Sequence, residues 1–268
     1  MSDFLTSMAE SSSRRAQAAR KDFTADELGR PVYPVRFDGF GVIAEIKKRS
    51  PAEGDLSAQA GSLASRARTY VDGGASAISV LTEPDRFDGA LADLEAVVDA
   101  VDGRDVPVMR KDFLVDPCQV LEAKAAGASG VLLIVAMLDL AATRRMLDSA
   151  FEHGMFVLLE SFDRADLEVT GKLLGEATYR EQAAERQLLV GVNTRNLRSL
   201  EVDPHRLEAL GPLLPAGAVS VAESGLHNAD DARRAAARGY RMALVGTALM
   251  RAADPAGCIR EMIAAGST

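Results

Sequence analysis

The feature of this sequence that most limits its fold is a regular alternation of two kinds of segment after residue 40. A short apolar run rich in Val, Ile and Leu is followed by an Ala-rich amphipathic stretch that ends near a glycine, and this unit occurs eight times. Near-continuous apolar runs between helices are typical of parallel strands covered by helices. The predicted strands are residues 42–47, 77–82, 106–113, 130–136, 156–161, 188–193, 218–224 and 242–247.

Eight such units predict an α/β protein with a closed (β/α)8 TIM barrel and a short N-terminal extension. An open doubly wound sheet is the alternative, but no G-x-G-x-x-G follows the first predicted strand. We expect residues 1–40 to form a partly helical extension and residues 41–268 to form the catalytic barrel. Residues 163–187 make an unusually long interval, for which we expect an enlarged helix or a helix with an insertion.

Composition and charge limit the partners. A formal charge of -8 without a dense Lys/Arg cluster argues against nucleic acid. The longest apolar run, residues 131–138, is too short to cross a bilayer, and the N-terminus lacks a signal-peptide pattern. We therefore expect a cytoplasmic protein that does not bind membranes and acts as a monomer.

The residues that most often bind metals are few and scattered. They lack the spacing of a metal site or of a disulfide framework, and we expect no metal. These residues are Cys118, Cys258, His153, His205 and His227.

Polar side chains gather at the carboxyl ends of the predicted strands, which is where active sites of this barrel lie. Side chains two residues apart point to the same face of a strand, so parity groups Glu45 with Lys47, Lys111 with Met109 and Phe113, and Asn193 with Arg195. Glu160 and Glu223 end two further strands. A single charged residue at a strand end is ordinarily solvated at the rim of the barrel or held in a salt bridge. Burying several such residues together costs free energy, so the set predicts a reaction site. Lys48 has the opposite parity and should be an outer, solvated lysine.

Small residues follow the seventh and eighth predicted strands. Ser224 and Gly225 come after the seventh, and Gly246 and Thr247 after the eighth. Each pair alone fits an ordinary tight turn. Because the last two loops of a (β/α)8 barrel commonly hold phosphate, the two pairs together predict a phosphorylated ligand.

Six segments that occur in order along the chain resemble the indole-3-glycerol phosphate synthase family. That resemblance implies ring closure of 1-(2-carboxyphenylamino)-1-deoxyribulose 5-phosphate with loss of carbon dioxide and water, as a step of tryptophan biosynthesis, without cofactor or metal. The chemistry requires acids and bases, because the ketone oxygen must be protonated during attack and a hydroxyl must later leave as water. The segments are residues 42–54, 79–94, 106–138, 188–203, 221–225 and 244–250.

The resemblance also implies roles for the catalytic residues. Lys111 is similar to the general acid, and Glu160 to its carboxylate partner, which acts as base. Glu45 and Lys47 resemble a second acid-base pair, and which lysine serves each step stays open. Asn193 would hold either the substrate or Glu45 in place.

Substrate-binding roles follow from the same matched segments. The polar side of the pocket would be lined by Arg195 and Glu223. The phosphate side would be formed by Ser50, Ser224, Gly225, Gly246 and Thr247, with Lys47 within reach. The resemblance also implies that an apolar wall around the aromatic ring is formed by Phe113, Leu132, Leu197 and Leu244. On physical grounds these four residues would fit equally well as ordinary core residues, and only the resemblance favours a binding role.

Three departures from the family pattern leave alternatives open. The N-terminal extension is shortened and altered, residues 160–168 replace a segment that usually contains histidine, and the interval from Glu160 to Asn193 is long. A paralogue acting on a related substrate in secondary metabolism is therefore one alternative. A sugar-phosphate isomerase barrel is another, although such barrels offer Asp or Cys where this chain has Glu45 and Lys47. A barrel that only binds its ligand would lack acid-base residues, and none of the expected set is missing.

Overall fold

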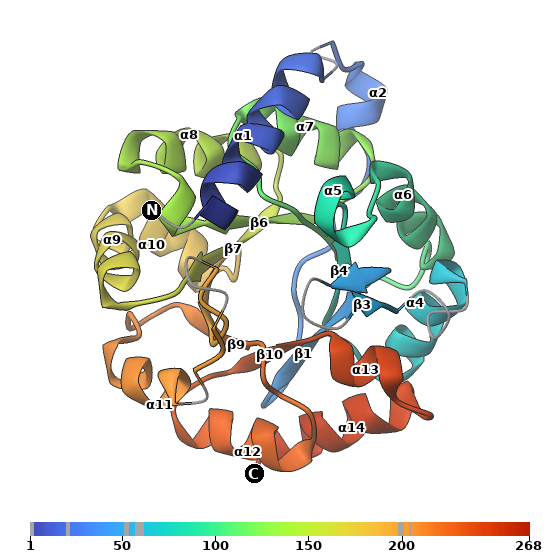
Figure 1. Ribbon diagram of the computed structural model, residues 1–268, viewed down its shortest axis with the longest axis vertical. Coiled ribbons are helices and arrows are strands. Elements are labelled where there is room, and N and C mark those ends of the chain that lie inside the picture. The colour runs from blue at the N-terminus through green and yellow to red at the C-terminus, as the bar shows by residue number, and fades with distance from the viewer. Residues whose placement is uncertain (1–2, 20–21, 51–53, 57–61, 198–200, 204) are drawn as a thin grey trace.

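The computed structural model describes residues 3–19, 22–50, 54–56, 62–197, 201–203 and 205–268. Eight parallel strands close into a barrel in the order β1-β10-β9-β8-β7-β6-β5-β4, so the predicted (β/α)8 barrel is confirmed (Figure 1). The strands are β1 (Gly41–Ile46), β4 (Ala77–Leu81), β5 (Val108–Lys111), β6 (Gly130–Ile134), β7 (Phe156–Ser161), β8 (Leu188–Asn193), β9 (Val219–Glu223) and β10 (Met242–Val245).

Helices surround the barrel, and several begin at a side chain that caps the first turn. Asp116, Asp139 and Asn228 each accept a backbone N–H of the helix that follows, as short polar residues at this position commonly do. The outer helices are α4 (Leu63–Asp72), α6 (Leu91–Ala100), α7 (Pro117–Ala125), α8 (Leu140–Glu152), α9 (Arg164–Leu174), α10 (Ala177–Ala184), α11 (Arg206–Leu210), α12 (Ala229–Ala237) and α14 (Pro255–Gly266). Shorter helices are α5 (Pro84–Phe87) and α13 (Thr247–Arg251).

The long interval between β7 and β8 contains two helices, α9 and α10, so its extra length is an inserted second helix. Tyr179 and Ala183 of α10 are buried, and the Tyr179 hydroxyl donates to Asp148 Oδ1 of α8 at 2.9 Å. The insertion therefore packs against the outer helical layer, away from the ends of the strands that carry the predicted site.

Strand parity divides the core into two apolar clusters. Residues on one face pack inside the barrel, among them Ile43, Met109 and Leu158. Their sequence neighbours pack between the strands and the outer helices, among them Val42 and Val157. Both faces of each strand are buried, and this explains the near-continuous apolar runs of the sequence.

Some predicted strand ends were wrong by one or more residues. The third predicted strand was extended to Phe113, but β5 ends at Lys111 because the Asp112 carboxylate accepts the Phe113 N–H at 2.8 Å and replaces a ladder bond. The eighth was extended to Thr247, which instead begins α13. Beyond β1 the chain forms a small unpredicted antiparallel pair, β2 (Arg49–Ser50) with β3 (Gly54–Asp55).

The first forty residues carry α1 (Asp3–Ala18) and α2 (Ala25–Leu28). In Figure 1, α1 lies beside α7 and α8 and points toward the barrel opening. It is tied to α7 by hydrogen bonds from Gln119 Nε2 to Ser12 Oγ at 2.9 Å and from Cys118 Sγ to the Ala16 carbonyl at 3.5 Å. None of the described helices is both long and apolar enough to span a membrane.

Candidate active site

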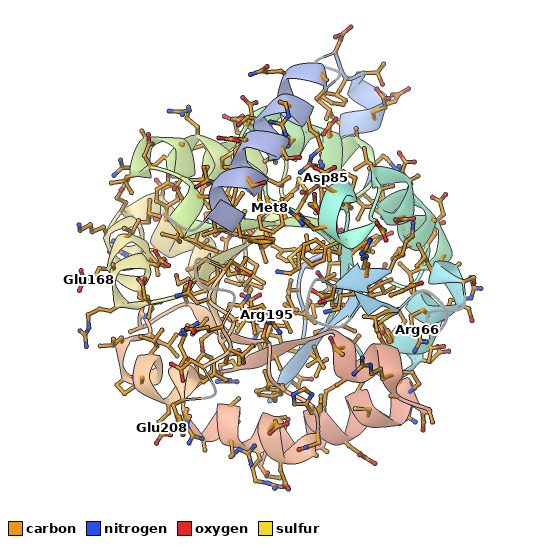
Figure 2. All side chains as sticks on the ribbon, viewed as in Figure 1. Met8, Arg66, Asp85, Glu168, Arg195 and Glu208 are labelled. Atoms are coloured by element: carbon orange, nitrogen blue, oxygen red, sulfur yellow. The ribbon has the colours of Figure 1, made fainter. Side chains whose placement is uncertain are left out.

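A cavity of about 490 Å³ opens at the carboxyl ends of the barrel strands. Of the sixteen predicted site residues, all except Glu160 line it. Figure 2 shows Arg195 near the centre of the ring of strands, whereas Glu168 and Glu208 lie at its outer edge. Segments far apart in the sequence therefore bring their polar ends to one opening, as parity predicted.

Lys111, at the end of β5, lies at the centre of a group of carboxylates. Its Nζ is 3.1 Å from Glu160 Oε2 and 3.7 Å from Glu223 Oε2. Burial by itself lowers the pKa of Lys111, but Glu160, Glu223 and Glu45 outweigh it and raise the pKa above its usual value. Lys111 is therefore an ammonium at neutral pH. Glu160 is absent from the cavity lining because it lies fully buried beneath this ammonium.

The second predicted pair is also formed. Lys47 Nζ lies 2.7 Å from Glu45 Oε1. Burial raises the pKa of Glu45, but the ammonium groups of Lys47 and Lys111 more than compensate and hold the pKa below its usual value. Lys48 turns away to Asp93 of α6 at 2.7 Å and does not line the cavity, so the parity prediction for it is correct, although the side chain is paired.

Glu223, at the end of β9, lies within this charged group and is almost fully buried. Burial and the neighbouring Glu160 carboxylate raise the pKa of Glu223 well above its usual range, and the opposing effect of Lys111 is smaller. The group then holds one carboxyl that keeps its proton at pH values where an ordinary glutamate has lost it.

The proton on Glu223 predicts a pH-dependent stability. The native state binds a proton that the unfolded chain loses near pH 4.5, so the stabilising effect is complete below that pH and is lost as the pH rises through the raised pKa. The variant Glu223→Gln cannot ionise at residue 223, so it does not lose this stability as the pH rises. We expect its melting temperature to rise relative to the unmodified protein as the pH increases from about 5 to about 8, in thermal unfolding at a series of pH values. Parallel pH curves for the two proteins would contradict the raised pKa, and Glu168→Gln on the outer face is the matched control.

Asn193 and Arg195 shape the polar side of the cavity. The Asn193 Oδ1 accepts the Arg195 backbone N–H at 2.9 Å, and Arg206 donates to the Asn193 carbonyl at 3.1 Å. Because its amide oxygen is engaged, the Asn193 NH2 is the group left to donate into the cavity.

The predicted phosphate-side residues all line the cavity, and two pairs of them follow the neighbouring strands β9 and β10. Ser224 and Gly225 both have left-handed backbone, with φ of 63° and 71°. Gly246 has no room for a side chain, since an added Cβ would lie 2.2 Å from Glu45 Oε1 and 2.9 Å from Lys47 Nζ. A substitution at Gly246 would therefore disturb the Glu45–Lys47 pair, and Ser224 is the better position at which to test phosphate binding.

The apolar wall contains the predicted Phe113, Leu132, Leu197 and Leu244, together with aromatic rings that we did not predict. Phe4 of α1 and Phe87 of α5 also line the cavity. Their rings lie 5.9 Å and 6.2 Å from the Phe113 ring, centroid to centroid. Phe87 stands in the segment 79–94 that carried the resemblance, whereas nothing in the local sequence around Phe4 indicates a pocket residue.

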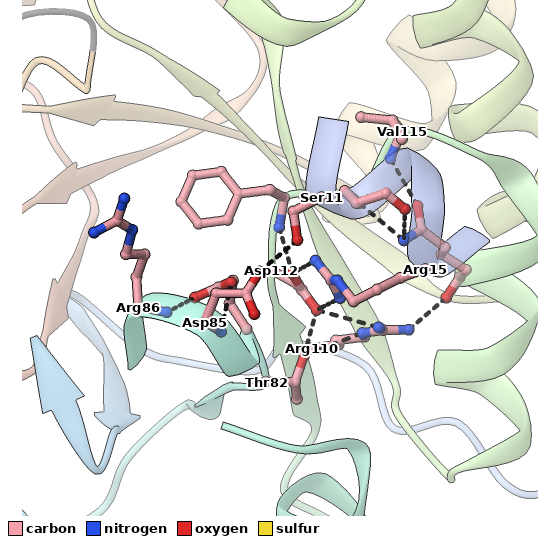
Figure 3. Close-up of polar contacts among 12 residues, drawn as sticks. Ser11, Arg15, Thr82, Asp85, Arg86, Arg110, Asp112 and Val115 are labelled. Atoms are coloured by element: carbon pink, nitrogen blue, oxygen red, sulfur yellow. Dashed lines mark hydrogen bonds and ion pairs between the residues drawn. The ribbon is translucent and has the colours of Figure 1, made fainter. Parts of the chain in front are cut away.

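Helix α1 of the N-terminal extension is held near Lys111 by a largely buried network of charged side chains (Figure 3). Arg15 of α1 donates two hydrogen bonds to Asp112, at 2.8 and 2.7 Å. The same carboxylate accepts from Thr82 Oγ1 at 2.8 Å and from Arg110 at 3.2 Å. Asp112 is next to Lys111 in the chain, so the position of α1 is coupled to the end of β5.

Arg15→Ala should loosen this connection. The loss of two charged hydrogen bonds should cost about 1.5–3 kcal/mol of stability, and displacement of Phe4 and of the end of β5 should lower turnover roughly ten-fold or more. Thermal unfolding and steady-state rates measure both effects. Arg14→Ala, at an exposed neighbouring position of the same helix, is the control. Equal rates for the two variants would mean that α1 does not position the site.

Among the residues that the structure describes, no three His, Cys, Asp or Glu side chains are grouped so that they could hold a metal ion. The charged groups present are instead ammonium–carboxylate pairs, which suit proton transfer and binding of an anionic substrate.

A family model described as indole-3-glycerol phosphate synthase matches residues 35–262. The chain belongs to the indole-3-glycerol phosphate synthase family. The resemblance found in the sequence is therefore confirmed, although residues 51–53 and 198–200 of the resembling segments lie outside the described residues.

Individual relatives carry the same family name. An indole-3-glycerol phosphate synthase of Nocardioides sp. is 47% identical over 232 residues, which cover 87% of this chain and 83% of the relative. One of Paenarthrobacter aurescens is 43% identical over 263 residues, covering 98% of this chain and 90% of the relative. Among solved structures, 3-hexulose-6-phosphate synthase from Salmonella typhimurium has a TM-score of 0.61 at 18% identity, covering 84% of this chain and 98% of that one; this likeness shows the fold alone.

Proposed function

We infer that this protein is an indole-3-glycerol phosphate synthase, a carboxy-lyase that closes the indole ring of 1-(2-carboxyphenylamino)-1-deoxyribulose 5-phosphate and releases carbon dioxide and water. Family membership over residues 35–262 supports this function rather than an isomerase or a paralogue with another substrate. The observation that carries the assignment of the site is the Lys111 ammonium between buried carboxylates at the cavity floor.

The first step that we propose uses Lys111 as general acid. As the ring carbon bearing the carboxylate attacks the sugar ketone, negative charge develops on the ketone oxygen. The Lys111 ammonium, charged because three carboxylates raise its pKa, donates a proton to that oxygen. Loss of carbon dioxide then restores the aromatic ring.

The second step removes water. A hydroxyl must leave with a proton, and the adjacent ring position must give one up. Glu160, at 3.1 Å from Lys111, is placed to act as base and to stabilise the positive charge of the intermediate. The Glu45–Lys47 pair, two strands away from Lys111 in the barrel, is a second donor and acceptor, and the geometry is compatible with either lysine as the acid of this step.

We further propose that the substrate phosphate lies against Ser50, Ser224, Gly225, Gly246 and Thr247, with the aromatic ring against Phe113, Leu132, Leu197 and Leu244. Arg195 supplies the nearby cationic side chain of the cavity wall. With this placement, the ketone falls between the phosphate and the ring, where Lys111 is available.

Ser224→Asp tests the phosphate position. An aspartate tolerates the left-handed backbone of residue 224 but brings a second negative charge toward the phosphate. At about 1 to 4 kcal/mol for such a repulsion, KM should rise at least ~10-fold while kcat changes little. Ser224→Asn has nearly the same shape without the charge and is the control. A similar KM for both variants would place the phosphate elsewhere.

The function itself is tested by incubating the purified protein with 1-(2-carboxyphenylamino)-1-deoxyribulose 5-phosphate and following indole fluorescence. Formation of a fluorescent product together with one equivalent of carbon dioxide is the expected result. Absence of product, with turnover of a ring-substituted analogue, would instead identify a paralogue.

Three finer statements remain proposals. We propose that the enzyme acts as a monomer in the cytoplasm. Light scattering after size exclusion measures the mass. We also propose that residues 1–40 are an extension that completes the site of a catalytic barrel formed by residues 41–268, as the contacts of Phe4 and Arg15 suggest.

A further inference from the structure

Gly191, in the middle of β8, occupies a position whose side chain would point into the barrel. It lies between Leu189, which packs inside the barrel, and Asn193, which lines the cavity. An added Cβ at Gly191 would lie 2.0 Å from Glu223 Oε1 and 3.2 Å from Glu223 Cδ. Separations below 3.0 Å are essentially never found for a real Cβ. The Glu223 carboxyl therefore occupies the space that any side chain at residue 191 would need.

Backbone conformation gives no reason for this glycine. Gly191 lies within a strand and is not among the residues with positive φ. A glycine in a strand interior loses conformational freedom and contributes no packing, so it usually marks a place where another group approaches closely. Here the approaching group is a carboxyl from the neighbouring strand.

The strand register explains why the space left by the missing side chain of Gly191 matters. Gly191 pairs with Glu160 of β7 on one side and with Val221 of β9 on the other. Glu223 is the next residue of β9 after Val221 that faces inward, and its carboxyl lies over Gly191 of β8. Its Oε2 thereby comes within 3.7 Å of Lys111 Nζ, the same ammonium that Glu160 Oε2 contacts at 3.1 Å.

We propose that Gly191 is a positioning residue for catalysis, because its missing side chain lets Glu223 lie beside the Lys111–Glu160 pair. Gly191 touches no substrate in this arrangement and acts only through Glu223. The proposal rests on the proposed function, in which Lys111 delivers the first proton. It adds a requirement that a side chain from a third strand lie beside Lys111.

The test is a double-mutant cycle of Gly191→Ala, Glu223→Ala and the double variant, with thermal unfolding and steady-state kinetics as readouts. Gly191→Ala should lower kcat at least ~10-fold and change KM less, because Glu223 is the one proposed substrate-binding residue that the methyl group displaces. In the Glu223→Ala background the carboxyl atoms that the methyl group would meet are absent, and the remaining close atom is Leu158 Cδ1 at 3.2 Å. There the methyl group should change neither the residual kcat by more than about two-fold nor the melting temperature by more than about 2 °C.

Gly171→Ala is the matched control, because an added Cβ there has no atom within 4 Å. Equal losses from Gly191→Ala in both backgrounds would overturn the proposal, since the glycine would then be needed for the backbone or for Leu158, whose Cδ1 is 3.2 Å from the added Cβ. A kcat of Gly191→Ala within about two-fold of that of the unmodified enzyme would also overturn the proposal.

If Gly191→Ala fails to fold, the folding of the double variant decides. A double variant that folds supports the proposal, and a double variant that does not fold rejects it. Should the unmodified protein not turn over the substrate, the proposed function fails, while the unfolding cycle still tests the contact.

Discussion

Lys111→Ala is expected to lower turnover at least ~100-fold, the usual contribution of a positioned general acid. The variant removes the ammonium that lies between Glu160 and Glu223, and with it the proposed acid of ring closure. It also leaves buried carboxylates without their cation. They should respond by taking up protons, and the accompanying loss of stability should therefore be smaller near pH 5 than at pH 8, the direction in which unpaired carboxylates titrate.

Two further variants separate chemistry from stability in this experiment. Lys111→Arg keeps the positive charge, but a guanidinium does not release its proton at accessible pH, so a stable yet inactive variant is expected. Lys48→Ala removes the adjacent lysine, which pairs with Asp93 outside the cavity, and should leave kcat nearly unchanged. If Lys111→Ala and Lys48→Ala turned over at similar rates, the role of Lys111 would have to be abandoned.

Strand parity made most of the site predictable. Glu45, Lys47 and Asn193 each follow an apolar residue that packs between the strands and the outer helices (Ala44, Ile46 and Val192), so their common direction follows from a period of two. Closure of the barrel then brings these strand ends together, and the number of repeated units indicated that closure. Both steps use local patterns that remain visible in one sequence.

The remaining features depend on tertiary contacts that no local pattern encodes. Phe4 and Arg15 reach the site from a helix about a hundred residues away from their partners Phe113 and Asp112. Strand ends were misjudged where side chains such as Asp112 replace backbone hydrogen bonds. The role of Gly191 could not be predicted from the sequence either. A glycine in a strand indicates a close approach only when the residue that lies against it from the neighbouring strand is known.

Glu160→Gln should lower turnover by about 100- to 10,000-fold, the range for loss of a positioned base. The amide has nearly the shape of the carboxyl but is neutral and cannot accept the proton, and the ammonium 3.1 Å away loses its nearest anion. Because Lys111 and Glu160 are paired at 3.1 Å and each holds the other in place, they should act as a unit. Lys111→Ala/Glu160→Gln should then fall little below the slower single variant, rather than to the product of the two effects.

Single-turnover and steady-state rates of the four proteins measure this coupling, with Glu168→Gln, an exposed position at the outer edge of the barrel in Figure 2, as the control for the substitution itself. Fully multiplicative losses would mean that Lys111 and Glu160 act independently of each other. In that case the base of dehydration would have to be sought elsewhere, and the Glu45–Lys47 pair, with Oε1 and Nζ 2.7 Å apart, would be the pair to test next.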